Sequence, residues 1–464
     1  MSSLPEVPSH RGTRTDVSLI NKSRSRRRRR ETHRVPEMIF ASIPAIIQVT
    51  RCIDVRSLAG SSIEPHLRVL RRVGFCRLPG AGGGAAGAGG GRPVRARLHD
   101  YYCMFALSVT SCYVLQQGVY AYQERGDLEK LARVLFVLLC HCTCVAKQLV
   151  FHAQAARVDR IIAGLHQPLF DPATAGAGAT AAAAAAARAL LRATARAAAR
   201  LLRAYYGCAV ATCVLWTIFP VVYKLRGFRI EFPFWTFLDY NQPVMFVIVL
   251  LHSFYATNLV AVGNTTMDAF IATVMDQCKT QLRILRMNFE TLPERARALT
   301  KESVNANYEE ILTKLLFECI QHFQKIADTM ALLEQVFGLA VLVQFTVGGW
   351  ILCMAAYKIV SVNVLSFEFA STTLFIVCIL TELFLYCYYG NEVTEESDRM
   401  VEAVYAMEWL HAPLRFKRSL VLVMERAKRP LRPAAGHLIP LSLDTFVTIL
   451  KSSYSFYAVL RQTK

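Results

Sequence analysis

Apolar residues along the chain gather in runs of about 20, which is the length that a helix needs to cross the hydrocarbon core of a bilayer. Two runs are weaker, because 131–151 contains Lys147 and 441–460 contains Lys451. Such polar residues are tolerated in a span where they face other helices or a wet path. The sequence therefore predicts an all-α membrane protein with seven transmembrane helices. The five stronger spans are 103–121, 204–223, 243–262, 336–357 and 369–389.

The distribution of positive charge predicts how these helices are oriented. Outside the predicted spans, 42 Lys and Arg residues lie in the N-terminal region and the even-numbered loops, and 8 lie in the other loops and the C-terminus. Positive residues favour the cytoplasmic side. We therefore expect a cytoplasmic N-terminus and an extracellular C-terminus. This orientation is inverted relative to G-protein-coupled receptors, which argues against that class.

Composition excludes most other classes. Of the 464 residues, 54% are hydrophobic and 19% are charged, which argues against soluble domains and against disorder over most of the chain. No nucleophile–base pair or phosphate loop stands out, so neither an enzyme with catalytic residues nor a cofactor is expected. The cluster Cys140, His141, Cys142 and Cys144 could suggest a metal site, but only Cys140 and Cys144 share a helix face, so buried thiols are favoured.

Three segments depart from this pattern. Residues 1–60 include the run Arg26–Arg30 and are interpreted as a disordered basic cytoplasmic tail attracted to anionic lipid, with a mistaken gene model as the alternative. Two Gly/Ala-rich insertions occupy 80–91 and 172–187. The second insertion leads into arginines spaced by three or four residues, which predicts a helix with one basic face that continues into the third span. These arginines are Arg188, Arg192, Arg196, Arg200 and Arg203.

The C-terminal third carries a recognisable order of short motifs. Leu385–Ser397 reads LYCYYGNEVTEES, Trp409 follows, and Ser453-Tyr454-Ser455 lies near the end of the chain. In this combination the chain resembles the insect odorant receptor family over residues 61–464, apart from the two insertions. The last motif favours odorant receptors over the related gustatory receptors. Loop 263–335 lacks the long insertion of the universal co-receptor, so the resemblance indicates a ligand-tuned subunit.

The resemblance implies a function and its partners. We expect the odorant-binding subunit of an odorant-gated, non-selective cation channel, assembled with the co-receptor as a heterotetramer in the plasma membrane of olfactory sensory neuron dendrites. The ligand would be a small volatile apolar molecule, and no nucleic acid is expected as a partner. Segment 392–440 would form a cytoplasmic anchor between subunits, with Trp409 at its packing core. The alternatives are a seven-helix chemoreceptor that signals through G proteins and a gustatory receptor.

The family also suggests where ligand and ions would bind. The ligand site would lie among spans two, three, four and six, and the last span, 441–460, would line the pore. Glu382 is the most conspicuous charge inside a span, and a structural pairing with Lys or His is favoured over a place in the ion path. The expected gate residues are Val459, Gln462 and Thr463. The expected ligand-binding residues are Phe136, Trp216, Phe219, Tyr223, Met245, Phe246, Val249, His252, Thr372, Thr373 and Ile376.

Overall fold

Long helices make up almost all of the computed structural model, which describes residues 57–78, 94–171, 180–227, 230–302, 307–362 and 366–462. All of them belong to one structural unit, Val55–Lys464. Most of the predicted 1–60 tail, the whole 80–91 insertion and residues 172–179 lie outside the described residues. The helices are α3 (Glu64–Arg72), α4 (Val94–Gln123), α5 (Leu128–Ala153), α6 (Ala155–Leu165), α7 (Ala181–Leu225), α8 (Pro243–Glu290), α9 (Leu292–Glu302), α10 (Tyr308–Ser361), α11 (Phe367–Ala406), α12 (Leu414–Ala427) and α13 (Leu443–Gln462).

Short elements join these helices. Single 3₁₀ turns lie at Gly60–Ser62 and Pro168–Phe170. The strands β1 (Ala434–Ala435) and β2 (Ile439–Pro440) form an antiparallel pair just before α13. Ala59, just before the first 3₁₀ turn, is fully buried, so at least the last residues of the predicted tail belong to the packed structure.

Each of the seven predicted spans is helical. Five helices are long and apolar enough to cross a membrane, namely α7, α8, α10, α11 and the segment Val134–Ala153 of α5. The other two predicted spans lie in α4 and α13, which are not among those five. Two spans therefore change places relative to the expectation. Span 103–121, expected to be strong, lies in α4, which is not among the five apolar helices. Span 131–151, expected to be weak, is strongly apolar from Val134 onward in spite of Lys147.

The four longest helices continue well beyond the length of a bilayer span. Helix α7 runs without a break from the Ala-rich insertion through the predicted third span, as the sequence predicts. It begins at Ala181 because the side chain of Thr180 accepts a hydrogen bond from the backbone N–H of Ala183. Asn307 caps α10 and Ser366 caps α11 in the same way. Polar caps thus fix where three of the long helices start.

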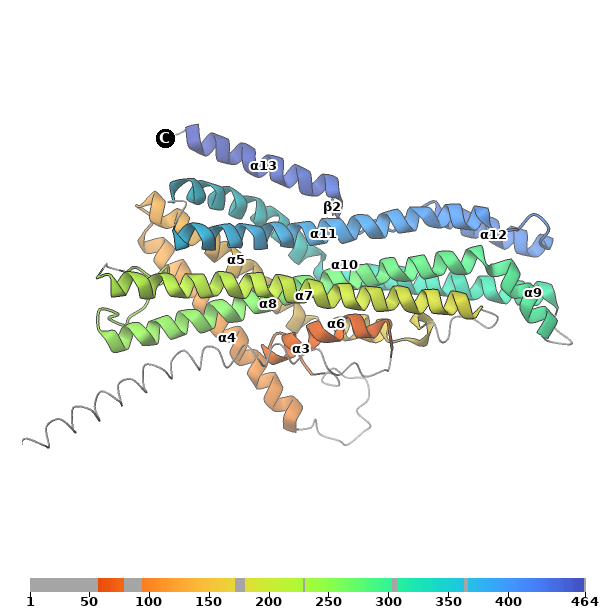
Figure 1. The fold of residues 1–464 in the computed structure, drawn as a ribbon, viewed down its shortest axis with the longest axis horizontal. Coiled ribbons are helices and arrows are strands. Elements are labelled where there is room, and N and C mark those ends of the chain that lie inside the picture. Colours follow the sequence, from red (N-terminus) through yellow and green to blue (C-terminus); the bar gives the residue numbers. More distant parts are fainter. Residues whose placement is uncertain are drawn as a thin grey trace, which may run out of the picture. The chain divides into compact units, whose positions relative to one another are not determined.

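Packing places α8 at the centre of the fold. Helix α8 lies along both α7 and α11, and α10 packs against α5, α8 and α11 (Figure 1). The segment of α8 from Val262 to Cys278 is buried at every position. Gly263 allows the ring of Phe75, which follows α3, to lie directly against the α8 backbone. The short N-terminal helix is thereby fixed to the central helix.

Candidate functional site

A cavity of about 420 Å³ is lined by residues of six helices, α4, α5, α7, α8, α10 and α11, and by the loop that joins α7 to α8. This volume is within the range of pockets that enclose small organic molecules, roughly 300–1,000 Å³. Four of the eleven expected ligand-binding residues line it: Phe136, Trp216, Phe219 and Tyr223. The other lining residues are Tyr113, Gln117, Val137, Cys213, Thr217, Pro220, Ile230, Glu231, Phe232, Pro233, Leu250, Ser253, Thr257, Lys358, Glu368 and Ser371.

Aromatic rings form one wall of the cavity. The ring centroids of Phe219 and Tyr223, on successive turns of α7, are 4.3 Å apart. Trp216 and Phe136 each contact Phe375 of α11, at 5.5 Å and 5.2 Å between centroids. Because aromatic faces interact well with apolar and aromatic ligands, this wall suits a small, largely apolar molecule.

A few polar groups complete the lining. Tyr113 is hydrogen-bonded to Thr257, with 3.0 Å between their oxygens. Gln117 accepts a hydrogen bond at Oε1 from Nδ1 of His141, at 2.8 Å. Lys358 lies 5.0 Å from the centroid of Phe136 and pairs with Glu368 at 3.2 Å. Most of these polar groups already have partners within the described part of the protein, but Nε2 of Gln117 is buried without one. The lining therefore combines an apolar wall with a few polar groups.

The loop between α7 and α8 covers one end of the cavity. Glu231 in this loop pairs with Lys130 at 3.2 Å, and this hydrogen bond raises the pKa of Lys130 above its usual value. The backbone N–H of Trp235 donates to the carbonyl of Gln116 in α4 at 3.0 Å. These contacts fix the loop to the helices on the opposite side of the cavity.

The remaining expected ligand residues are not part of the lining of the cavity. Phe246 and Val249 pack against the loop residues Phe232 and Phe234. His252 shares a hydrogen bond with Gln116, at 3.1 Å between Nε2 and Oε1. The other four are half-buried or buried elsewhere on α8 and α11: Met245, Thr372, Thr373 and Ile376.

A second cavity of about 60 Å³ shares Cys213, Trp216 and Thr257 with the larger one. Its volume is enough for a few water molecules. Its lining includes Glu382 and Asn264, so it extends from the aromatic wall toward the charged groups in the centre of the fold.

Those charged groups form a buried cluster on three helices. Lys147 of α5 donates to Asp268 of α8 at 2.6 Å and to Glu382 of α11 at 2.7 Å. The hydroxyl of Tyr386 donates to the same oxygen of Asp268, and Asn264 donates to Glu382 at 3.3 Å. None of the three charged side chains is more than 1% exposed. The pairing that the sequence predicted for Glu382 is therefore present, with Lys147 as its partner.

Helix α13 has one face open. Phe446, Ile449 and Leu450 pack against the rest of the protein, and Ser453 is 6% exposed. A row with helical spacing is exposed on the opposite side: Asp444, Thr448, Lys451, Ser455 and Val459. Of the expected gate residues, Val459 is 60% exposed, the side chain of Gln462 is not among those described, and Thr463 lies outside the described residues.

Comparison with known proteins assigns the family. The family model "7tm Odorant receptor" matches residues 127–454, which is more than half of the chain. The chain belongs to the 7tm odorant receptor family. It is therefore a multi-pass membrane protein of a chemoreceptor family and not an enzyme.

Curated odorant receptors resemble the chain at low identity. Odorant receptor 85c of Drosophila melanogaster is 26% identical over 199 residues, which is 43% of this chain and 50% of that receptor. Odorant receptor 2a of the same species is 22% identical over 242 residues, 50% of this chain and 59% of the relative. The chain thus spans about half the length of these relatives. Odorant receptor Or1 of Anopheles gambiae is 20% identical over 370 residues, 75% of this chain and 85% of Or1.

Solved structures show the same fold. The olfactory receptor OR5 of Machilis hrabei matches with a TM-score of 0.72 and 14% identity, over 87% of this chain and 98% of that one. The structure of OR5 in complex with eugenol matches with a TM-score of 0.71. At this identity the likeness concerns the arrangement of helices alone.

Several cavity residues of this odorant receptor were missed from the sequence. Tyr113 and Gln117 belong to α4, a helix that was not expected to contribute to the site. A signal was nevertheless present in the sequence, since the polar Thr110 and Gln117 are seven residues apart and so share one face of the helix, which is the face that the structure buries. Polar residues on the buried face of a span mark contacts with other polar groups or with a cavity.

Proposed function

We propose that this odorant receptor is the ligand-binding subunit of an odorant-gated cation channel. The observation that carries the proposal is the cavity of about 420 Å³ with its wall of Phe136, Trp216, Phe219 and Tyr223. A small volatile apolar molecule matches this cavity in size and chemistry. Eugenol, with which one of the Machilis OR5 structures is in complex, is a small aromatic molecule and a reasonable first probe.

The channel part of the proposal rests on α13. Its exposed row of Thr448, Lys451 and Ser455 would be costly against lipid, but it suits the wall of a water-filled pore built from several subunits. We propose a heterotetramer with the odorant co-receptor, with Val459, Gln462 and Thr463 near its gate. Residues 291–307, which include the short α9, join α8 to α10, and a connection of this length supports a ligand-tuned subunit rather than the co-receptor itself.

The proposed orientation is a cytoplasmic N-terminus and an extracellular C-terminus, with seven spans in the plasma membrane of the sensory dendrite. The excess of Lys and Arg in the N-terminal region and even-numbered loops supports it. In this orientation the cavity lies toward the extracellular side and α12 in the cytoplasm. The alternative of signalling through G proteins would place the termini the other way round.

Electrical recording tests the proposal directly. Cells would express this chain with and without the co-receptor, and current would be recorded across a panel of volatile molecules while G-protein signalling is blocked. We expect a fast inward cation current that needs both subunits. A response that disappears with the G-protein block, or an N-terminal epitope accessible on intact cells, would contradict the channel proposal. A response to soluble tastants but not to volatile molecules would favour a gustatory receptor.

A further inference from the structure

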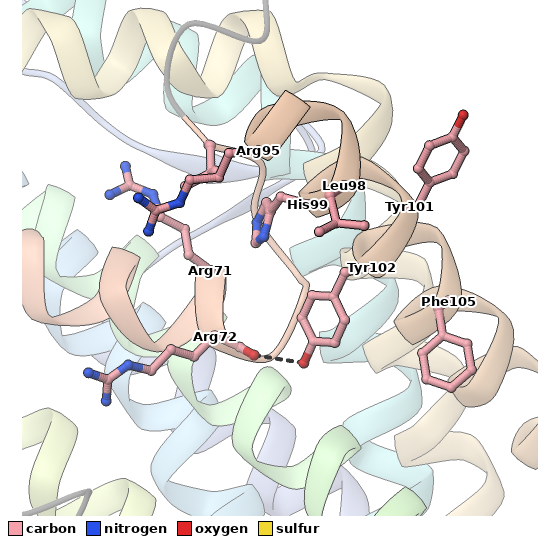
Figure 2. A pocket seen from close by; sticks show the side chains of 9 residues that line it. Arg71, Arg72, Arg95, Leu98, His99, Tyr101, Tyr102 and Phe105 are labelled. Carbon is pink, nitrogen blue, oxygen red and sulfur yellow. Dashed lines mark hydrogen bonds between the residues drawn. The ribbon is translucent and has the colours of Figure 1, made fainter. Parts of the chain in front are cut away.

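An open groove of about 730 Å³ lies between α3 and the start of α4. Figure 2 shows its side chains: Arg71 and Arg72 come from the last turn of α3, and Arg95 comes from the first turn of α4. The hydroxyl of Tyr102 donates to the carbonyl of Arg72 at 2.7 Å and closes the groove on one side. The groove is separate from the ligand cavity, with which it shares no residue.

The groove carries positive charge that its neighbours do not neutralise. Figure 2 shows the side chains of Arg71 and Arg95 extending to the same side of the groove. Within the part of the chain that the structure describes, none of the three arginines has a carboxylate within 4.0 Å, and Nε of Arg71 is buried without a hydrogen-bond partner. Burial raises the pKa of Asp159 in α6, and the charges of Arg71 and Arg77 oppose this rise from beyond ion-pair distance. Figure 2 shows the guanidinium group of Arg72 extending apart from those of Arg71 and Arg95, so Arg71 and Arg95 form the part of the groove that most favours a charged oxyanion such as a phosphate.

Apolar side chains continue directly from the groove along α4. Leu98 is 69% exposed, Tyr101 is 74% exposed and Phe105 is 56% exposed. Leu98 follows Arg95 by three residues, which is about one helical turn or ~4.5 Å along the axis. Exposed apolar rows of this kind face lipid in a membrane protein, and Tyr is typical of the level where headgroups meet acyl chains. This position would put the three arginines at the level of the lipid headgroups, next to an exposed apolar row that acyl chains can contact.

We propose that this groove binds the phosphate headgroup of an anionic phospholipid, with the acyl chains lying along Leu98, Tyr101 and Phe105. Arg71, Arg72 and Arg95 supply the charge, and the Tyr102 bond holds α3 against α4. A soluble phosphate would use the same guanidinium groups but would gain nothing from the apolar row. The combination of the two surfaces therefore favours a lipid over a free anion.

Thermal stabilisation of the purified full chain in neutral detergent tests this proposal. A ligand that binds the folded state raises the melting temperature, and the rise grows with the logarithm of the ratio of ligand concentration to Kd. The probes are dioctanoyl phosphatidylinositol 4-phosphate, dioctanoyl phosphatidylcholine and free inositol 1,4-bisphosphate. We expect stabilisation by the first probe, none by the second and weak or no stabilisation by the third. Equal stabilisation by free inositol phosphate would overturn the assignment to a lipid.

Two triple variants distinguish binding at this groove from a general attraction of the basic protein to anionic lipid. R71Q/R72Q/R95Q should bind the phosphoinositide at least about tenfold more weakly, since each basic residue near an anionic headgroup contributes on the order of 1 kcal/mol. R188Q/R192Q/R196Q removes the same charge from the exposed face of α7 and should bind as the parent does. Equal losses in both variants would overturn the proposal. If the first variant does not fold, R72Q alone, which changes an exposed side chain, should still weaken binding measurably.

Discussion

Lys147 and Glu382 are 235 positions apart in the sequence, yet Nζ of Lys147 lies 2.7 Å from Oε1 of Glu382 in the centre of the helical bundle. Asp268 binds the same ammonium group at 2.6 Å, so one cation connects α5, α8 and α11. All three side chains are excluded from solvent. Charges are retained in such a place only when they are paired, because desolvation costs several kcal/mol per ion. The cluster therefore determines how these three helices fit together.

Replacing Lys147 by Met should destabilise the protein strongly. The variant keeps most of the length of the side chain but leaves two buried carboxyl groups without their cation, which typically costs about 3–5 kcal/mol. The melting temperature in detergent and the amount of folded receptor at the cell surface should both fall. The triple variant K147M/D268N/E382Q removes the uncompensated charge and should recover part of the loss.

A matched lysine serves as the control. Lys428 pairs with Glu425 at 3.1 Å on the surface of α12, where both side chains are more than half exposed. The variant K428M should melt at the parent temperature, since exposed pairs contribute little. Equal changes in melting temperature for K147M and K428M would show that the buried cluster contributes no more to stability than an exposed ion pair.

Gly263 allows Phe75 to contact the backbone of α8. A Cβ at this position would overlap the Phe75 ring, which is fully buried. Gly263→Ala should therefore cost about 1–3 kcal/mol through overpacking. Gly207→Ala is the control, because nothing lies within 4 Å of a Cβ at Gly207 in α7, and there alanine should stabilise the helix by up to about 1 kcal/mol. Opposite shifts in melting temperature are expected, and a neutral Gly263→Ala would contradict this packing.

His66 in α3 predicts a dependence of stability on pH. Burial lowers the pKa of His66 to about 4, against 6.5 for an exposed histidine. Between these values the unfolded chain binds more protons than the folded one, so stability should fall as pH drops from 6.5 toward 4, by at most about 1.4 kcal/mol per pH unit for this group. Melting scans at pH 7.5, 6 and 5 measure the slope. His66→Gln should reduce it, and an unchanged slope would assign the effect to other groups.

The apolar runs predicted all seven spans as helices, but they did not predict how far each helix extends. Residues 263–335 were counted as a cytoplasmic loop, whereas α8 continues to Glu290 and α10 begins at Tyr308. Asp268 lies in this extension, so hydropathy alone gave no reason to pair it with Lys147. Pairing between α5, α8 and α11 depends on their relative rotation and depth, which hydropathy does not encode.

Hydropathy also did not predict which residues of α8 line the cavity. The sequence identified α8 as a wall of the site and named Met245, Phe246, Val249 and His252. The α8 residues that line the cavity are Leu250, Ser253 and Thr257. Val249 and His252 lie on a neighbouring face, whereas Phe246 shares the face of the lining residues one turn nearer the start of α8, where it packs against the loop. A span that is apolar all round carries no signal for which face meets a cavity. Aromatic residues of α7 were easier to identify, because Trp216, Phe219 and Tyr223 recur at helical spacing.

Trp216 should be a determinant of ligand affinity. It lines both cavities and contacts Phe375, so Trp216→Ala removes part of the aromatic wall. Loss of an aromatic contact of about 0.5–1.5 kcal/mol should raise the half-maximal concentration of an aromatic odorant by up to about tenfold. Trp235→Ala, in the loop but not on the lining, should leave this concentration unchanged. Equal shifts in the two variants would indicate that the ligand binds elsewhere.

The exposed row of α13 can be tested with two serines that are two residues apart. Ser455 lies on the open face, whereas Ser453 is 6% exposed and its hydroxyl donates to the carbonyl of Ile449. If the open face lines an aqueous pore, a charged thiol reagent should reduce the ligand-evoked current of Ser455→Cys expressed with the co-receptor. Ser453→Cys should be insensitive, because the reagent does not reach a side chain packed between helices. Modification of Ser453→Cys alone, or of neither variant in the open channel, would contradict a pore-lining role for this face of α13.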